Sequence, residues 1–245
     1  MNVLVLGGTS DIARAFALKL ASPEDQFLLA ARSESELEIV AADLKIRTGA
    51  AVQIICFDAE NRESYQDIDR RFIERLGTID GVLLAFGYLG EQQRAESDDV
   101  EASRIIEVNL TGAISMMEPL AAYFEERGSG WILGLSSVAG VRGRRSNYIY
   151  GAAKSGLTTY LEGLAHRLSP RGVRVKIAKI GFVASKMTRG LPMPPWAVAD
   201  PQSVARSLVW LLRSPIQSAF IPWRWWLIMA VIRLLPAYIF NRTRL

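Results

Sequence analysis

Cysteine and histidine are almost absent from this chain of 245 residues, which contains one of each, Cys56 and His166. A single cysteine excludes an internal disulfide framework, and these two residues cannot make a Cys/His metal cluster. Met1 leads directly into an apolar run, without the basic and apolar segments of a secretory signal. We therefore predict a protein without a metal in a reducing, cytoplasmic compartment. We expect Cys56 to pack within an apolar run and His166 to have no catalytic role.

Acidic residues are missing from the last part of the chain. Asp200 is the last carboxylate side chain, and residues 201–245 contain six arginines. Because the whole chain carries a net charge of +4, the first 200 residues carry −2. A nucleic-acid-binding face is usually a basic patch on a polar surface, whereas these arginines lie among Trp, Leu and Ile. The distribution argues against a nucleic-acid partner.

No segment is long and apolar enough to span a bilayer, which takes about 20 apolar residues. The most apolar stretch, 222–236, is interrupted by Arg224 and Arg233 and carries three tryptophans. This composition is typical of a segment that lies in a membrane interface, which would give peripheral contact with the inner face of the membrane through 223–240. A terminal helix that packs on the domain or against a second subunit explains the same residues equally well.

Apolar runs that predict strands alternate along the chain with amphipathic segments that predict helices. The predicted strands are 2–6, 27–31, 52–57, 79–85, 131–135, 173–180 and 219–222. The predicted helices are 12–20, 35–48, 61–76, 99–127, 150–168 and 201–213. This alternation without a repeat predicts an α/β protein of the Rossmann type, with a doubly wound parallel sheet of about seven strands. We assign one domain to 1–222 and an amphipathic helical tail to 223–245.

A turn rich in small residues follows the first predicted strand, with Gly7 and Gly8 ahead of a helix that starts near Ile12. Glycine lets the backbone approach a ligand closely, and the free N–H groups of a helix start attract an anion. The pattern is typical of a phosphate-binding turn, although such turns also serve as plain connections. The second strand ends on Arg32, where NAD-binding folds usually carry an acid. Arg32 favours NADP(H) over NAD(H), unless its guanidinium is only solvated.

Three polar residues stand at the end of one predicted strand and in the helix that follows: Ser137, Tyr150 and Lys154. Helical geometry places Lys154 on the same face as Tyr150. A nearby ammonium lowers the pKa of a phenol from its ordinary value of about 10, which makes the phenol a better acid at neutral pH. Ser137 can donate to the same substrate oxygen. Asn109, in an apolar stretch, either supports water beside Lys154 or is a polar residue satisfied within a helix kink.

In these residues and their spacing the chain resembles the short-chain dehydrogenase/reductase family over nearly its full length. The resemblance implies an NAD(P)-dependent oxidoreductase that moves a hydride between nicotinamide and a carbonyl or secondary alcohol. It implies the catalytic residues Asn109, Ser137, Tyr150 and Lys154, and a homodimer or homotetramer. It implies that the cofactor is bound by Gly7, Thr9, Ser10, Asp11, Ile12, Arg32, Asp58, Ala59, Ala85, Phe86, Gly87, Tyr150, Lys154, Gly181, Val183 and Ser185.

Two segments depart from the family's pattern. In the glycine-rich turn, Asp11 and Ala13 replace the second and third glycines, and we expect the Asp11 carboxylate to turn away from a pyrophosphate and cap the helix. After the fourth strand, only Gly87 remains of the family's Asn-Asn-Ala-Gly segment. These departures allow a different class of function, a catalytically silent dinucleotide sensor or scaffold. The intact Asn, Ser, Tyr and Lys set argues against it.

A further set of residues is similar to a subfamily of reductases that act on a decaprenylphosphoryl 2-keto pentose, such as 2-keto-ribose. The similar pieces are 7–10, 85–90, Arg144-Arg145 and the tail around Leu235-Pro236. They indicate a subfamily rather than a substrate.

A carbonyl carried on a polyprenyl phosphate would explain two features, the apolar tail and the arginines Arg142, Arg144 and Arg145. Guanidinium groups suit phosphate, although three arginines in a solvated loop need no ligand. The rival substrate is a long-chain 3-keto lipid, which would also favour an apolar tail. Either substrate would pass a mobile lid, which we predict over 186–199.

Overall fold

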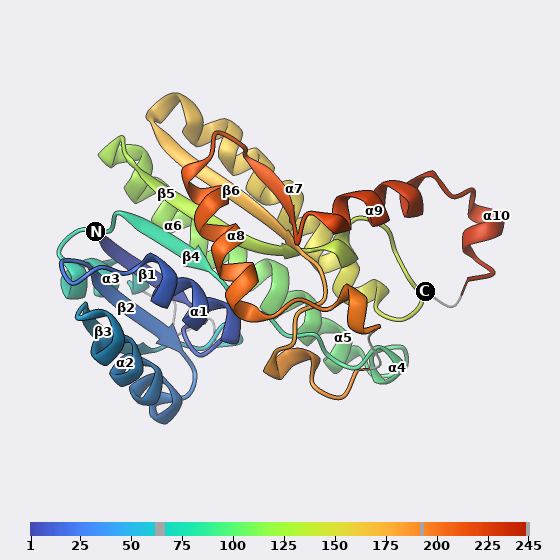
Figure 1. Cartoon of the computed structure of the whole chain (residues 1–245), viewed down its shortest axis with the longest axis horizontal. Helices are drawn as coiled ribbons and strands as arrows, with labels where there is room; N and C mark the ends of the chain where they lie inside the picture. The colour runs from blue at the N-terminus through green and yellow to red at the C-terminus, as the bar shows by residue number, and fades with distance from the viewer. Residues whose placement is uncertain (62–66, 192–193, 244–245) are drawn as a thin grey trace.

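The computed structural model describes residues 1–61, 67–191 and 194–243, which form one seven-stranded sheet with helices on both sides (Figure 1). The strands are β1 (Asn2–Leu6), β2 (Gln26–Ala31), β3 (Ala51–Cys56), β4 (Gly81–Leu84), β5 (Gly130–Ser137), β6 (Val173–Ile180) and β7 (Ser218–Ile221). Neighbouring strands pair in parallel in the order β3-β2-β1-β4-β5-β6-β7. The strand order reverses beside β1, and ligands of such sheets bind at this switch point. The predicted fold class is confirmed.

Helices cover both faces of the sheet. One face carries α1 (Asp11–Leu20), α2 (Glu34–Thr48) and α8 (Pro201–Arg213), and the other carries α3 (Ile68–Leu76), α6 (Gly112–Arg127) and α7 (Tyr148–Leu168). Two shorter helices, α4 (Gln92–Ala95) and α5 (Asp99–Ile106), pack against α7. The helix predicted over 61–76 is described from Ile68 onward, because 62–66 lie outside the described residues.

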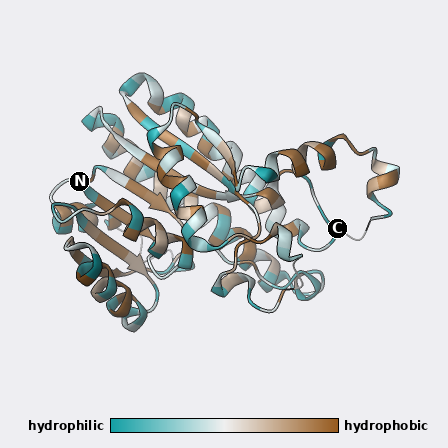
Figure 2. Ribbon diagram, in the orientation of Figure 1, coloured by the Kyte–Doolittle hydropathy of each residue, from teal (hydrophilic) through white to brown (hydrophobic). Residues whose placement is uncertain are grey.

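Strand β1 shows how the sequence divides the core between the two faces. Val3 and Val5 belong to the apolar cluster under α1 and α8, whereas Leu4 and Leu6 belong to the cluster under α6 and α7. Successive side chains of a strand point to opposite faces, so a sheet covered on both sides requires a continuous apolar run. Figure 2 shows hydrophobic residues concentrated along the strands and hydrophilic ones on the outer surfaces of the helices.

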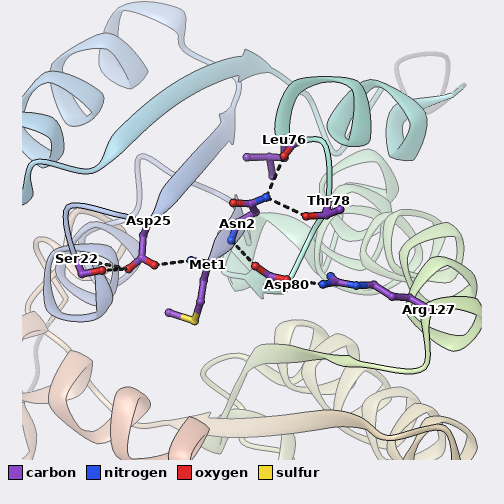
Figure 3. Close-up of polar contacts among 8 residues, drawn as sticks. All are labelled: Met1, Asn2, Ser22, Asp25, Leu76, Thr78, Asp80 and Arg127. Atoms are coloured by element: carbon purple, nitrogen blue, oxygen red, sulfur yellow. Dashed lines mark hydrogen bonds and ion pairs between the residues drawn. The ribbon is translucent and has the colours of Figure 1, made fainter.

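A polar network fixes the amino-terminal end of β1 (Figure 3). The Met1 ammonium lies 2.6 Å from Asp25 Oδ1, and the Asn2 backbone N–H donates to Asp80 Oδ2 at 2.7 Å. Arg127 on α6 pairs with the other carboxylate oxygen of Asp80 at 2.6 Å. Burial alone would raise the pKa of the Asp80 carboxyl, but hydrogen bonds from Arg127 and Asn2 outweigh it and lower that pKa. The network ties β1 to the loops that precede β2 and β4.

Local signals explain where several elements end. Asp200 accepts from the Ser203 N–H at 2.9 Å and caps α8, as its place before a proline predicts. Within the segment 99–127, a π-helical turn at Glu107–Thr111 separates α5 from α6. The interpretation of Cys56 as a packed residue is wrong, because β3 is an edge strand and Cys56 is exposed.

The tail forms α9 (Arg224–Leu234) and α10 (Ala237–Phe240), which lie at the right of Figure 1. One side of α9 packs on the domain through Trp225, Met229 and Ile232, all buried. The opposite side exposes the large apolar side chains of Trp223, Trp226, Leu227, Val231 and Leu234. Within the described ranges, no helix is long and apolar enough to cross a membrane. The tail therefore packs on the domain, as one of its two interpretations expects, and still presents an apolar surface.

Candidate active site

The residues identified from the sequence gather at the carboxyl ends of the strands, where they line one pocket. Its lining includes the predicted cofactor residues Gly7, Thr9, Ser10, Asp11, Ile12, Arg32, Asp58, Ala59, Ala85, Phe86, Gly87, Gly181, Val183 and Ser185. The lining also includes Ser137, Tyr150 and Lys154, whereas Asn109 is buried behind it. Across the part of the chain that the structure describes, no group of His, Cys, Asp and Glu could hold a metal ion. The pocket thus joins a nucleotide-binding edge to a hydroxyl, a phenol and an amine.

The turn after β1 packs closely against the loop that follows β4. Gly7 has φ +91°, and a Cβ at this position would lie 2.5 Å from Phe86 N. The N–H groups of Gly7 and Gly8 donate to Ala30 O at 2.8 and 3.0 Å, which fixes the turn against β2. Only glycine fits this conformation without strain. Gly7 therefore lets the turn that leads into α1 lie against Phe86.

The Asp11 side chain turns toward the segment that begins at Lys186, and it does not cap α1. Its carboxylate Oδ2 accepts from the backbone N–H of Lys186 at 2.6 Å, and the Lys186 ammonium pairs with Glu36 at 2.7 Å. Lys186 begins the segment 186–199 that was predicted as a lid. The carboxylate that replaces a family glycine therefore holds the first residue of this segment against the first turns of α1 and α2.

Arg32 shares a carboxylate with an arginine that the sequence analysis missed. Its Nη1 lies 3.1 Å from Glu60 Oε1, and Arg104 Nη2 on α5 lies 2.9 Å from the same oxygen. The Asp58 side chain accepts from the Glu60 N–H at 3.0 Å. Arg32 is 60% exposed, so its ion pair with Glu60 is weak and open to exchange for a stronger anion. Glu60 is 28 positions from Arg32 and 44 positions from Arg104 in the sequence, and the order of strands in the sheet brings the three side chains together.

Ser137 is held by backbone on both sides. Its Oγ accepts from the Ala139 N–H at 3.1 Å and donates to Ile180 O at 3.4 Å. The short turn after β5 lies directly on α7, because a Cβ at Gly140 would approach Ser155 N to 2.6 Å and a Cβ at Gly151 would approach Ala139 O to 2.8 Å. The two glycines set the separation between Ser137 and the helix that carries the phenol and the amine.

Tyr150 and Lys154 are both buried on α7, with 9% and 4% of their surfaces exposed. Lys154 Nζ lies 5.8 Å from the centroid of the Tyr150 ring and donates to Leu135 O at 3.2 Å. Burial raises the pKa of Tyr150 to about 12, against a lowering by its hydrogen bond with Ser137, and burial lowers the pKa of Lys154 to about 8. The net shift of the Tyr150 pKa is therefore upward, because removal from water outweighs the lowering by Ser137.

Asn109 lies inside the π-helical turn between α5 and α6. Its Nδ2 donates to Tyr88 O at 2.5 Å and to Ile105 O at 2.8 Å, while its Oδ1 accepts from the Tyr88 N–H at 3.2 Å. The Asn109 amide is therefore satisfied within the helix kink, whereas its support of a water beside Lys154 stays a prediction. A Cβ at Gly87 would lie 2.8 Å from Asn109 Oδ1 and 3.5 Å from Lys154 Nζ, so the loop after β4 passes closely between them.

The carboxyl end of β6 is covered by the tail. The Trp225 indole lies directly over Gly181, so closely that a Cβ at Gly181 would overlap its ring. The Trp225 and Phe182 rings pack edge to face with centroids 5.0 Å apart. Val183 pairs with Ala199, which closes the loop that contains the predicted lid; Pro192 and Met193 of this lid lie outside the described residues. The family pattern explains the glycine, but nothing in the sequence identified Trp225 as its partner.

The three arginines of the loop before α7 lie in different environments. Arg142 donates to the Ile232, Arg233 and Leu235 carbonyls at the end of α9, so it is a helix cap rather than a phosphate ligand. Arg145 is exposed, as the solvated-loop alternative expects. Arg144 is buried and lines the pocket.

Known proteins with similar sequences and structures support this description. The family model described as short chain dehydrogenase matches residues 1–194. An uncharacterized oxidoreductase of Mycobacterium tuberculosis is 36% identical over 240 residues, covering 98% of this chain and 96% of the relative. The crystal structure of levodione reductase has a TM-score of 0.78 and 26% identity, covering 86% of this chain and 90% of that one. A short-chain dehydrogenase from Sphingobium yanoikuyae in complex with NADPH has the same fold, with a TM-score of 0.83, 20% identity and 96% of each chain covered.

Proposed function

The chain belongs to the short-chain dehydrogenase/reductase family and is an NAD(P)-dependent oxidoreductase, and we propose that it reduces the carbonyl of an organic substrate with NADP(H). The observation that carries this proposal is a buried phenol, hydroxyl and amine at the lip of a nucleotide-binding turn. Levodione reductase, one of the similar structures, is a reductase by name, which supports the proposal.

Ser137, Tyr150 and Lys154 act on the carbonyl oxygen. Tyr150 has a pKa of about 12 and is therefore protonated at neutral pH, which is the state that a proton donor needs. Ser137 exchanges its long bond to Ile180 O for the substrate oxygen and orients it. Lys154, with a pKa of about 8, is mostly charged at neutral pH and stabilises the phenolate as the proton leaves. Asn109 supports a relay water beside Lys154 from the π-helical turn.

The cofactor residues follow the same edge of the sheet. The turn at Gly7 to Ile12 would hold the pyrophosphate, Asp58 and Ala59 would hold the adenine, and Lys154 would hold the nicotinamide ribose. When bound, NADP(H) supplies or accepts the hydride. Arg32 would release Glu60 and bind the 2′-phosphate instead, while Arg104 would keep Glu60 paired. The resulting preference for NADP(H) over NAD(H) follows from the charge of Arg32.

Replacement of Tyr150 by Phe tests the proposed chemistry. We expect kcat for NADPH-dependent reduction of ketones to fall by about 10²-fold or more, because general acid catalysis supplies about that factor. NADPH binding, followed by fluorescence titration, should change little. Tyr148→Phe is the matched control, since Tyr148 is 45% exposed on the same helix and should keep full activity. Full turnover in the Tyr150→Phe variant would refute the mechanism, and equal use of NADH would refute the cofactor preference.

For the substrate we propose two chemical classes, a lipid-linked keto sugar and a long-chain 3-keto lipid. A decaprenylphosphoryl 2-keto-ribose, or a related lipid-linked keto sugar, is supported by the exposed apolar side of α9 and by the arginine within the pocket. A long-chain 3-keto lipid is supported by the apolar side of α9 alone. The third candidate is a dinucleotide sensor without turnover. It does not explain why Tyr150 and Lys154 are buried together in the pocket.

We further propose that the enzyme is cytoplasmic and that its tail contacts the inner face of the membrane. The tail combines the exposed apolar side chains of α9 with two exposed arginines, Arg233 and Arg242, a composition that suits anionic headgroups over an acyl layer. A homodimer or homotetramer, as the family resemblance implies, is compatible with this placement.

A further inference from the structure

Arg144 is a buried cation without a counter-charge. It is 7% exposed, and among residues 1–61, 67–191 and 194–243 no carboxylate lies within ion-pair distance of it. Its Nε is buried without a hydrogen-bond partner. Burial alone lowers the pKa of the guanidinium, with no opposing charge to raise it. A charge held in this way is costly unless something else pairs with it.

Other arginines of this chain show what is normal for it. Arg104 pairs with Glu60 and Arg127 with Asp80, while Arg142 caps α9 and lies 3.9 Å from the centroid of the Phe240 ring. Arg144 differs because its side chain lines the pocket that also contains the proton donor Tyr150. Its partner is therefore expected to come from within the pocket.

A second unpartnered polar group belongs to the same turn. The Asn147 Oδ1 atom is buried without a hydrogen-bond donor, and Asn147 lines the pocket. The Asn147 N–H donates to Arg144 O at 3.1 Å, and Asn147 O accepts from the Gly151 N–H at 2.8 Å. The backbone thus locks Arg144 and Asn147 to the first turn of α7, which carries Tyr150.

The anion is not part of the cofactor. Gly7 and Arg32, which we assign to the phosphates of NADP(H), follow β1 and β2, whereas Arg144 follows β5. In the sheet order, β5 lies on the opposite side of β1 from β2, with β4 between β1 and β5. Arg144 therefore belongs to the half of the pocket where the proton donor, and hence the carbonyl, is placed.

From these contacts we propose that the substrate carries an anionic group, a phosphate or a carboxylate, which binds Arg144. The proposal rests on the reductase function proposed above and defines its substrate class as a negatively charged ketone. Guanidinium presents paired N–H donors that match both anions. Arg144 is a specificity residue in this role, because it selects the substrate without taking part in proton transfer.

Binding to the protein saturated with NADP⁺, which cannot reduce a ketone, separates recognition from turnover. Calorimetric titration would compare dihydroxyacetone phosphate with dihydroxyacetone, and 4-oxopentanoate with its methyl ester. We expect at least one anionic ketone to bind tenfold or more tightly than its neutral partner. The phosphate and carboxylate pairs identify which anion the pocket takes.

Variants of Arg144 decide the assignment. Arg144→Met should abolish the preference for the anionic ketone, Arg144→Lys should keep part of it, and the exposed neighbour in Arg145→Met should leave it unchanged. Thermal unfolding checks that Arg144→Met folds, and its Tm should not fall, because the variant removes a buried unpaired charge. Equal binding of charged and neutral ketones by the wild type, or an unchanged preference in Arg144→Met, would overturn the proposal. Loss of all turnover without loss of this binding difference would instead refute only the reductase function.

Discussion

At the scale of single residues, the active site depends on burying two groups that water would stabilise in their charged forms. Tyr150 is pushed toward its neutral state and Lys154 loses part of its affinity for a proton, because the same apolar surroundings act on both. Below pH 8, the charge on the buried Lys154 ammonium therefore lowers the free energy of unfolding. Functional sites commonly hold such strained protonation states.

Replacement of Lys154 by Met should make the protein more stable at neutral pH. The folded-state pKa of about 8 lies below the ordinary value of 10.5, so between these values the unfolded chain binds more protons and wild-type stability rises with pH. Below pH 8 the full cost applies, on the order of 3 kcal/mol for this difference in pKa. Urea unfolding of both proteins should therefore show a gap that is largest at pH 7 and shrinks toward pH 10. The exposed Lys45→Met change is the control, and a gap that is constant with pH would contradict the pKa of about 8.

Individual site residues could be predicted from sequence where spacing along one element sets the geometry. Tyr150 and Lys154 are four residues apart on one helix, and Gly7 follows a buried strand, so local rules place them. The shared carboxylate of Glu60, the clip between Asp11 and Lys186 and the unpaired Arg144 depend on contacts across the sheet. No local pattern marks these contacts. The direction of the Tyr150 pKa also depends on burial, which spacing alone does not give.

At the scale of elements, α9 supports the substrate half of the site. Trp225 packs on the bare backbone of Gly181 where β6 ends, and Met229 continues the same buried stripe one turn later. A helix that is apolar on both sides is expected to be covered on both sides. In α9, the domain covers the side that carries Trp225 and Met229.

The Gly181→Ala change should disturb this support. The added methyl would overlap the Trp225 ring, and overpacking of this kind costs about 1–3 kcal/mol of unfolding free energy. Gly163→Ala on α7 is the matched control, because its Cβ would meet open space, and it should stabilise by about 0.5–1 kcal/mol. In a double-mutant cycle, Trp225→Leu should relieve part of the Gly181→Ala cost. Strict additivity of the two changes would show that the indole does not restrain β6.

The elements themselves were largely predictable, since apolar runs and helical periodicity specify the strands and most helices. Asp200 correctly predicted the start of α8, because its side chain caps the helix. The division of 99–127 was not predictable, because the π-helical turn arises where Asn109 bonds to the Tyr88 and Ile105 carbonyls. One of these partners is close in sequence and the other is 21 residues away.

At the scale of the whole molecule, the tail adds a surface that the sheet does not require. Its exposed tryptophans and aliphatic side chains form one side of α9, while the domain covers the other. The sequence predicted the doubly wound sheet correctly, because its alternation of elements leaves few alternatives. Composition could not decide between membrane contact and packing on the domain, since a helix apolar on both sides serves both.

The membrane proposal is tested by flotation with vesicles that contain phosphatidylserine. Truncation after Pro222 is a poor test, because it would also remove the packed side chains of Trp225 and Met229. Joint replacement of Trp223, Trp226 and Val231 by Ser should abolish flotation of the protein. Trp210→Ser on α8 removes an equally exposed tryptophan and should leave flotation intact. A wild type that stays with the unbound protein, and is dissociated to a smaller oligomer by the triple change, would identify the surface as a subunit contact instead.

The cap that Arg142 places on the last turn of α9 has a mechanical consequence. The same short loop holds Arg142 in the end of that helix and Arg144 in the wall of the pocket. If the tail docks at a lipid surface as we propose, a shift of the end of α9 would reach Arg142 directly. Arg144 lies only two residues further along the chain, so docking and substrate binding would act on neighbouring positions of one loop.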